Sequence, residues 1–587
     1  QRSYGAPTAI TLDTTYYHSN SQACMMTTPW GDRKAGHGIV GALQYLHEQD
    51  LNAIYVIPMN LGGDGKDTYP FATVHDYDVF WYAGHENQPP SGSGHPQVLG
   101  PQEPWRLFQY SVKRMQEWNT VLEFAMSRGI FVQMLLHEQE RANLHWLGYD
   151  WNPSAPLSPI QLPNSASHWI ESPRLHLRHA RQLYIKMMLA LFGHHPGLQW
   201  NLCEENQWRE NFTPPLPHMG GPVPVQFTLR QLEAMARWIE YLQPYYDHPI
   251  TVHARGGDEE CYEHILRADP YGTSSTYTVP GTYNPGAGQT GAGDWIDAVS
   301  FYVYGDGPVT MGSDTYDRGN EDLPAAPHEF DAKSESLRAM VESTNVVAPG
   351  WGVPTRLALS VDEQGNWKWG ASGRNFQTLL NANQGYATDA SSATERRRVV
   401  LWDTLLSGCG LEWYFGYGHE ADGWPIEPPF TQPNPSLNQG GSDISCEEFM
   451  SRSELWQHSR AARAVLETVP YWRGTPQDSL ITNECNDGDP PGTRGEAQVL
   501  AFTSQLTNDV DDVFLVIYFP EICPMADPLG DLDLSFAPVN TVFSGIFYDP
   551  ATGVALGPST PFMNGDDYTK SPPDTAGIDV LLVVRQL

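Results

Sequence analysis

Residues 198–206 read LQWNLCEEN, a strand pattern that runs directly into two adjacent carboxylates, Glu204 and Glu205. A long helical pattern over residues 173–192 precedes this stretch, and a second one over residues 229–242 follows it. A short strand between two helices is the repeating unit of a parallel sheet, whose crossover helices cover the strands. The two carboxylates are therefore expected at the carboxyl end of a parallel strand.

The same alternation of strand and helix extends along the chain to about residue 470. Predicted strands cover residues 9–17, 52–59, 130–136, 198–203, 250–254, 298–304, 356–361 and 411–415. Predicted helices cover residues 37–49, 105–128, 173–192, 229–242, 259–267, 330–343, 394–407 and 453–468. Repeated β/α units in this number predict an α/β fold, a closed (β/α)8 TIM barrel.

The pattern changes after residue 470, where short β-rich runs separated by Pro, Gly and Asp turns replace the helical period. These runs cover residues 498–503, 513–519, 533–534, 541–547 and 578–584. Short strands with turn signals and no helices predict a small C-terminal β-sandwich. Two domains are therefore expected, a catalytic barrel over residues 1–470 and a sandwich over residues 471–587.

The composition of the chain argues against several classes of function. The sequence holds 34 Lys and Arg against 69 Asp and Glu, a formal net charge of −35. A surface this acidic repels phosphate backbones and anionic lipids, so a nucleic-acid partner is not expected. No apolar run approaches the roughly 20 residues of a membrane span. The 19 Trp and 28 Tyr exceed what core packing usually requires, and flat sugar faces are a common partner for such rings.

Active sites of TIM barrels lie at the carboxyl ends of the strands, and polar residues of this chain gather there. The candidates for substrate binding are His137, Glu138, Asn206, His253, Tyr304 and Trp413. Each also has a structural alternative, such as a core position for Trp413. The candidates include no metal-ligand triad with fixed spacing and no phosphate-binding glycine loop, so no organic cofactor is expected.

Carboxylates at the ends of strands four and seven face each other across a barrel mouth. That arrangement suits a retaining glycosidase, in which one carboxyl group protonates the leaving oxygen and the other, about 5 Å away, attacks the sugar. In residues 198–206, the alternation of large apolar side chains places Glu205 rather than Glu204 in phase with the lumen. The same test on residues 356–363 favours Asp362 over Glu363, unless a β-bulge resets the phase.

Four stretches of the chain carry a family resemblance. They are IYVIPMNLGGDGKDTYPF (residues 54–71), FGHHPGLQWNLCEEN (192–206), LSVDEQG (359–365) and GLEWYFGYG (410–418). They resemble the retaining (β/α)8 glycoside hydrolases of the clan that contains many cellulases and β-galactosidases. The closest similarity is to a little-characterised bacterial family of secreted glycosidases, often with an N-terminal sandwich domain. The resemblance covers roughly residues 11–470.

The resemblance implies a role for several of these residues. It implies Glu205 as the acid/base and Glu363 as the nucleophile, with Asp362 as the alternative that the strand phase favours. Glu204 stands where the clan has Asn, so the acid/base stays open between Glu205 and Glu204. Tyr304 matches a strand-six Tyr that positions the nucleophile, and Trp413 matches the aromatic residue that floors the sugar site.

Two further features concern metal binding and cellular location. Acidic clusters at residues 487–489 and 509–512 are candidates for structural calcium, with solvated turns as the alternative. Cys485 and Cys523 could form a disulfide if the protein is exported. The chain begins at Gln1 without Met, which favours a processed protein, secreted or at the cell surface or periplasm of a bacterium.

The main hypothesis is a retaining glycoside hydrolase that acts on a polysaccharide or on its oligosaccharides. The alternative is a non-catalytic carbohydrate-binding or cell-surface assembly protein on the same scaffold, because a fold does not determine function. The sugar, its linkage, endo or exo action and the oligomeric state do not follow from the sequence.

Overall fold

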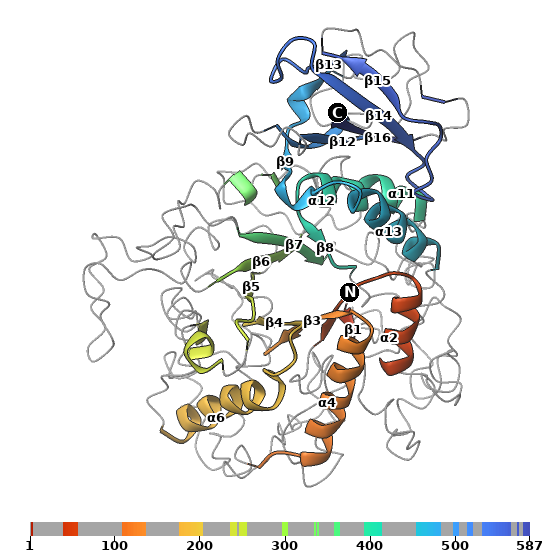
Figure 1. Cartoon of the computed structure of the whole chain (residues 1–587). Coiled ribbons are helices and arrows are strands. Elements are labelled where there is room, and N and C mark those ends of the chain that lie inside the picture. Colours follow the sequence, from red (N-terminus) through yellow and green to blue (C-terminus); the bar gives the residue numbers. More distant parts are fainter. Residues whose placement is uncertain are drawn as a thin grey trace, which may run out of the picture.

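The computed structural model describes part of the chain. The described residues are 2–3, 39–56, 109–136, 175–202, 235–236, 238–243, 246–254, 296–302, 334–335, 337–339, 357–363, 393–413, 453–482, 497–503, 513–520, 531–564, 572–573 and 579–587. They include a parallel sheet in the N-terminal part and antiparallel sheets in the C-terminal part (Figure 1).

The parallel sheet has eight strands whose spatial order is their order in the sequence. The strands are β1 (Arg2–Ser3), β2 (Ala53–Val56), β3 (Phe131–Leu135), β4 (Leu198–Asn201), β5 (Ile250–Ala254), β6 (Ala298–Tyr302), β7 (Ala358–Glu363) and β8 (Gly410–Leu411). Figure 1 shows them curling around a common centre. This sequential, parallel and curled order is that of a TIM-like α/β fold, as the alternation predicted.

Helices lie on the outer side of this sheet (Figure 1). They are α2 (Ile39–Glu48), α4 (Val112–Ser127), α6 (Leu175–Phe192), α11 (Ala393–Arg396), α12 (Trp402–Leu406) and α13 (Ser453–Leu466). Residues 235–236, 238–242, 334–335 and 337–339 are helical as well. The helix predicted over residues 394–407 contains a π-helical turn, Arg397–Leu401, between α11 and α12. None of the helices in the described ranges is long and apolar enough to cross a bilayer.

The described strand next to β2 is not the one that the sequence predicts as the first strand. The strand that pairs with β2 is Arg2–Ser3, in register with Tyr55 and Val56. The predicted strand over residues 9–17 lies outside the described residues.

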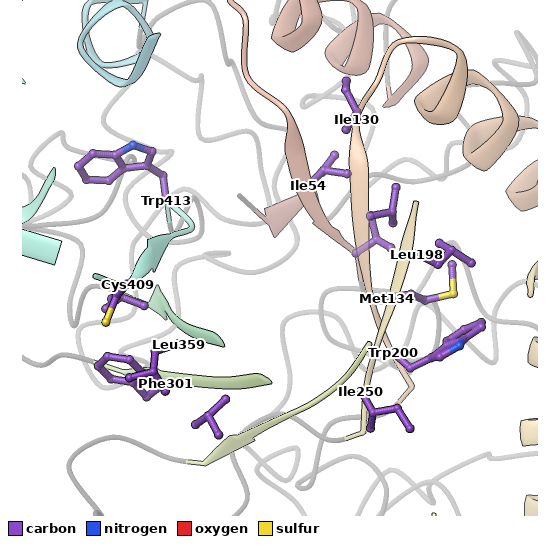
Figure 2. Close-up of a cluster of buried hydrophobic side chains, with 14 of the residues drawn as sticks. Ile54, Ile130, Met134, Leu198, Trp200, Ile250, Phe301, Leu359, Cys409 and Trp413 are labelled. Carbon is purple, nitrogen blue, oxygen red and sulfur yellow. The ribbon is translucent and has the colours of Figure 1, made fainter. Parts of the chain in front are cut away.

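Alternate residues of the parallel strands form the barrel's hydrophobic core. In β4, Leu198 and Trp200 are buried in one cluster with Met188 and Phe192 of α6. Figure 2 shows part of this cluster along the strands. Successive residues of a strand point to opposite faces, so Gln199 and Asn201 belong to the inner face. The outer face of the sheet is therefore apolar, and the inner face carries the polar side chains.

The C-terminal part forms a six-stranded antiparallel sheet in the order β15-β14-β16-β12-β11-β9, and a two-stranded sheet of β10 and β13. The strands are β9 (Thr475–Pro476), β10 (Ile481–Thr482), β11 (Gln498–Phe502), β12 (Phe514–Phe519), β13 (Asp531–Leu532), β14 (Val542–Tyr548), β15 (Thr560–Met563) and β16 (Val580–Gln586). Short 3-10 helices, Tyr471–Arg473 and Asp478–Leu480, flank β9.

Strand β12 explains how this sheet is covered. Phe514, Val516 and Tyr518 join the core of the barrel. The alternate residues Leu515 and Ile517 join a second core, against which residues near β10 and β13 pack. The antiparallel β unit was predicted, but within the described residues the second layer of the predicted sandwich is only two short strands. Helices of the barrel cover the other face.

Candidate active site

Polar side chains from non-neighbouring strands meet inside the curled sheet. Gln133 Nε2 of β3 donates to Ser300 Oγ of β6 at 3.4 Å. Asn201 Nδ2 of β4 donates to Tyr55 Oη of β2, also at 3.4 Å. Strands β3 and β6 are separated by two others in the sheet, so the Gln133–Ser300 contact crosses the interior. These side chains fill the barrel centre with hydrogen-bonding groups rather than aliphatic ones.

The same layer extends to the neighbouring strands. Gln199 Nε2 donates to Gln133 Oε1 at 2.9 Å, and Thr251 Oγ1 lies 3.5 Å from Ser300 Oγ. Gln133, Thr251 and Ser300 are buried. A buried polar group is stable only when it is hydrogen-bonded, and this layer supplies the partners. The layer therefore forms a rigid polar floor beneath the carboxyl ends of the strands.

A histidine–aspartate pair lies at the carboxyl ends of β5 and β7. His253 Nε2 is 3.2 Å from Asp362 Oδ1, and both side chains have 0% exposure. Because β6 lies between β5 and β7, the pair spans an intervening strand. His253 was predicted as a substrate-binding residue and Asp362 as an alternative nucleophile. The structure brings the two together, and in this state both are withdrawn from solvent.

Strand β7 contains a register shift at the two predicted carboxylates. β6 and β7 pair regularly from Ala298 with Ala358 to Phe301 with Val361, and the next pair is Tyr302 with Glu363. One extra residue, Asp362, is thus inserted in β7. A β-bulge of this kind resets the alternation of faces, so the two-residue period cannot be extended across it.

Two residues follow β8 in the described part of the chain. Glu412 is buried, and its backbone N–H donates to the Val361 carbonyl at 2.8 Å. The Trp413 indole Nε1 donates to Ser459 Oγ of α13 at 2.9 Å. Trp413 belongs to the hydrophobic cluster of the barrel, and Figure 2 shows it beyond β8. It therefore occupies the core position that was its structural alternative.

Several predicted residues lie outside the described ranges. They are the acid/base candidates Glu204 and Glu205, the binding candidates His137, Glu138, Asn206 and Tyr304, the two acidic clusters and the Cys485–Cys523 pair. The described part of β4 leads directly to the two glutamates, since Leu202 is the last described residue before them. Within the described residues, no group of three or more His, Cys, Asp or Glu could hold a metal ion.

The polar floor was not among the site residues predicted from the sequence. Gln133, Thr251 and Ser300 alternate with apolar residues in their strands, and this period was the available signal. The period assigns each side chain to a face, but it does not show which strands lie opposite each other. The contact between β3 and β6 follows from the curl of the sheet.

Comparisons with known proteins find only distant similarity to solved structures. No family model matches the sequence, and no curated protein matches it. A solved glycoside hydrolase is 14% identical with a TM-score of 0.47, over 93% of this chain and 88% of that one. A glycoside hydrolase family 5 protein from Bacteroides vulgatus is 13% identical with a TM-score of 0.48, over 93% and 85% of the two chains.

A family 5 mannosidase from Rhizomucor miehei is 11% identical with a TM-score of 0.40, over 76% of this chain and 91% of that one. All three TM-scores lie below one half. The TIM-like fold is therefore assigned from strand order, register and the contacts across the interior.

Proposed function

We propose that the chain is a retaining glycoside hydrolase that cleaves O-glycosidic bonds of a polysaccharide or oligosaccharide. In this proposal Glu363 is the nucleophile and Glu205 the acid/base. The observation that supports it is the bulge in β7, where the β6–β7 register skips Asp362 and resumes at Glu363. Asp362 is buried against His253, and Glu363 is in register with Tyr302.

The register favours Glu363 as the nucleophile. Ser300 belongs to the inner face through its contact with Gln133, and Tyr302 is two residues further along β6. Residues in register on neighbouring parallel strands belong to the same face of the sheet. A carboxylate that attacks an anomeric carbon must also be reachable by the sugar, a condition that the buried Asp362 side chain does not meet. Both points argue for Glu363.

The acid/base assignment rests on the period of β4. Trp200 and Leu202 join the outer core, whereas Asn201 makes its hydrogen bond inside the sheet. Continuing this alternation favours Glu205 over Glu204 for the inner face. The assignment extends the observed period of β4 by four residues from Asn201. Substitution of Glu204 and Glu205 tests it.

The proposed reaction has two steps. The Glu363 carboxylate attacks the anomeric carbon while the Glu205 carboxyl group donates its proton to the leaving oxygen, which forms a glycosyl ester with the enzyme. Glu205, now ionised, then removes a proton from water as that water attacks the anomeric carbon and releases Glu363. Two displacements at one carbon retain its configuration, provided that the carboxyl groups lie about 5 Å apart.

Digestion of a polysaccharide panel and a panel of 4-nitrophenyl glycosides tests this proposal, with product configuration read by NMR. We expect retention, and a fall in kcat of about 1,000-fold or more for Glu363→Gln and for Glu205→Gln at unchanged melting temperature. Glu204→Gln is the matched control, for which a much smaller effect is expected.

Azide distinguishes the two roles. In Glu363→Ala, azide should restore turnover and give a glycosyl azide of inverted configuration, because it attacks in place of the nucleophile. In Glu205→Ala, azide should act in the second step and give a product of retained configuration. Inversion by the wild-type enzyme would exclude the double displacement. Glycan binding without any released product would favour the non-catalytic alternative.

A further inference from the structure

We propose that Tyr471 and Trp472 form a second carbohydrate site, separate from the catalytic one, that binds an uncharged polysaccharide chain. We call the two residues the aromatic corner. They belong to the 3-10 turn Tyr471–Arg473 between α13 and β9, which Figure 1 shows between the barrel helices and the C-terminal sheet. The choice of ligand class rests on the proposed function, whereas the site itself follows from the described residues.

Both rings of the aromatic corner face solvent. Trp472 is 69% exposed and Tyr471 is 41% exposed. Within the described residues, neither ring belongs to the core of the barrel or to the second core of the C-terminal part. The ring centroids are 5.6 Å apart, and the ring planes lie at 78° to each other. Such an edge-to-face pair presents two walls at nearly a right angle, so the indole can contact the face of a sugar ring while the phenol contacts its edge.

The turn that carries the two rings is held in place on both sides. The Tyr471 N–H donates to the Val469 carbonyl at 2.8 Å, and the Gly474 N–H donates to the Tyr471 carbonyl at 2.9 Å. The Arg473 guanidinium lies over the Phe502 ring of β11, 4.1 Å from its centroid. A site that already has its bound geometry loses less conformational entropy when the ligand arrives.

Gly474 adds a packing constraint directly after the turn. A Cβ atom at this position would lie 2.7 Å from Leu500 Cγ of β11, so the backbone approaches the C-terminal sheet more closely than another residue would allow. The next two residues form β9, which pairs with Leu500 and Ala501. The backbone is thus packed against the sheet while both rings remain exposed. Packing of the core therefore does not account for the position of the rings.

The size and the charge of the surface select the ligand. A fully buried aromatic side chain covers about 150–250 Å², so the two partly exposed rings offer less than about 300 Å². A stable protein partner needs about 800 Å² on each side, whereas the smaller area suits one or two sugar rings. The formal net charge of −35 disfavours polymers of uronates or sulfated sugars. An uncharged polysaccharide is the ligand that meets both conditions.

The aromatic corner is separate from the catalytic ends of the strands. Arg463, in the last turn of α13, donates to the carbonyl of Asp50, which lies three residues before β2. The chain therefore enters the turn from the side of the amino ends of the parallel strands, whereas the proposed catalytic carboxylates belong to the carboxyl ends. A polymer that spans both sites gains an effective concentration at the catalytic one, and a short glycoside gains nothing.

Affinity electrophoresis of the full chain tests this site, in gels that contain soluble β-glucan, glucomannan, xylan or polygalacturonate. The variants are Trp472→Ala, Tyr471→Ala and Trp472→Phe. Tyr241→Ala is the matched control, because Tyr241 is 87% exposed on a helical segment of the barrel. Each substitution changes an exposed ring, so the melting temperatures should stay within about 2 °C of the wild-type value.

We expect at least one of the three uncharged polymers to retard the wild-type protein. Trp472→Ala should weaken this binding by at least about 10-fold and Tyr471→Ala by about 3-fold, because the indole exposes the larger face. Trp472→Phe should keep part of the binding, and Tyr241→Ala all of it. Unchanged retardation of Trp472→Ala would overturn the inference, and so would a wild-type protein that none of the uncharged polymers retards.

Activity supplies a second readout. On the polymer that retards the wild-type protein, Trp472→Ala should raise KM by about 10-fold with kcat within a factor of about 2, while the kinetics on a 4-nitrophenyl glycoside stay the same. Equal losses on both substrates would contradict a separate site. Sedimentation tests a protein partner, because a wild-type dimer that Trp472→Ala dissociates would show a second copy on the aromatic corner and would overturn the inference.

These measurements separate the carbohydrate site from the proposed function. If the wild-type protein hydrolyses no glycoside but Trp472→Ala loses the retardation, the hydrolase proposal fails and the carbohydrate site stands. If the wild-type protein hydrolyses glycosides and all variants are retarded alike, the hydrolase proposal stands and the second site is excluded.

Discussion

The His253–Asp362 pair can be compared with a second buried group of ionisable side chains, the junction cluster of Arg397, His458, Tyr518 and Asp579. The pair joins two strands at their carboxyl ends. The junction cluster joins the outer helices of the barrel to the C-terminal sheet. Both groups are buried and ionisable, so burial of ionisable side chains alone does not identify an active site in this protein.

The junction cluster is a dense set of hydrogen bonds. Arg397 Nε and Nη2 donate to the two carboxylate oxygens of Asp579 at 3.0 and 2.8 Å, and Tyr518 Oη donates to Asp579 Oδ2 at 2.8 Å. Arg397 Nη1 lies 3.0 Å from His458 Nε2. The Trp402 ring stacks on that of Tyr518, with centroids 5.5 Å apart. Such a bidentate, multiply bonded pair suits a structural role.

The two groups differ in their position relative to the carboxyl ends of the strands, and this position indicates which group serves the fold and which serves the site. The junction cluster lies on the outer side of the parallel sheet, among groups that continue the hydrophobic core. The pair lies next to the bulge that precedes Glu363. We therefore expect substitutions in the junction cluster to change stability without changing kcat, and substitutions in the pair to change kcat.

Arg397→Met should have the largest effect on stability. It leaves Asp579 buried without its bidentate partner, and breaking a buried ion pair in this way costs about 3–5 kcal/mol of unfolding free energy. Denaturant unfolding measures the loss, and kcat of the folded variant should be unchanged. Arg463→Met is the control, since the Arg463–Glu467 pair is partly exposed and worth less than about 1 kcal/mol. A fall in kcat for Arg397→Met would contradict a purely structural role for the junction cluster.

Tyr518→Phe should have the next largest effect. It removes one donor to Asp579 and keeps the ring that stacks on Trp402. A hydrogen bond to a buried charged group is worth about 2 kcal/mol. Burial, followed by the charge of Asp579, raises the pKa of Tyr518 well above 10.0, so the phenol stays protonated as a donor at neutral pH. A loss below about 0.5 kcal/mol in thermal or denaturant unfolding would indicate that water replaces the hydroxyl group.

Acidification should weaken the fold through histidines outside the strand ends. Burial, followed by His194, lowers the pKa of His195 from 6.5 to about 4. Burial, followed by the charge of Arg397, lowers the pKa of His458 as well. Both imidazoles are neutral when folded but take up a proton near pH 6.5 when unfolded. Their contribution to stability is therefore complete above about pH 6.5 and falls as the pH drops below it; for His195 the fall continues to about pH 4.

His195→Gln isolates part of this effect. Between pH 7 and pH 5, the wild-type protein should lose up to about 2 kcal/mol more than this variant. The difference between the two proteins is the informative quantity, because burial raises the pKa of Glu240, Asp297 and Glu335, which titrate in the opposite sense. Parallel stability curves for the two proteins would contradict the assignment of a neutral His195.

Ser459→Ala should have the smallest effect. It removes the acceptor of the Trp413 indole N–H and should cost about 1 kcal/mol of unfolding free energy. Gln457→Ala, at an exposed position of the same helix, is the control. If Trp413 serves the core, kcat/KM should not change. A drop in kcat/KM of about 10-fold would return Trp413 to the sugar site that the family resemblance implies.

Much of the fold follows from local patterns in the sequence. The strand 250–254 was predicted with the bounds of β5, and the helices over 37–49, 173–192 and 453–468 agree with α2, α6 and α13 within two residues. Helical and strand periods are local properties, so a single chain segment carries the signal. The β unit at the C-terminus was predicted for the same reason, but its sharing of the barrel core was not. The apolar run FLVIYF of β12 is buried on both faces, and only packing reveals what covers each face.

Local patterns in the sequence predict the alternation of strands and helices, the parallel order that this implies, and carboxylates near the carboxyl ends of strands four and seven. The bulge in β7 and the partner of Asp362, on which the proposed roles of Asp362 and Glu363 rest, are visible only in the folded structure. The bulge in β7 is a relation between β7 and β6, and the partner of Asp362 comes from β5. A two-residue period read along one strand contains neither relation, because register is set by pairing between distant segments and by the side chains that close over them.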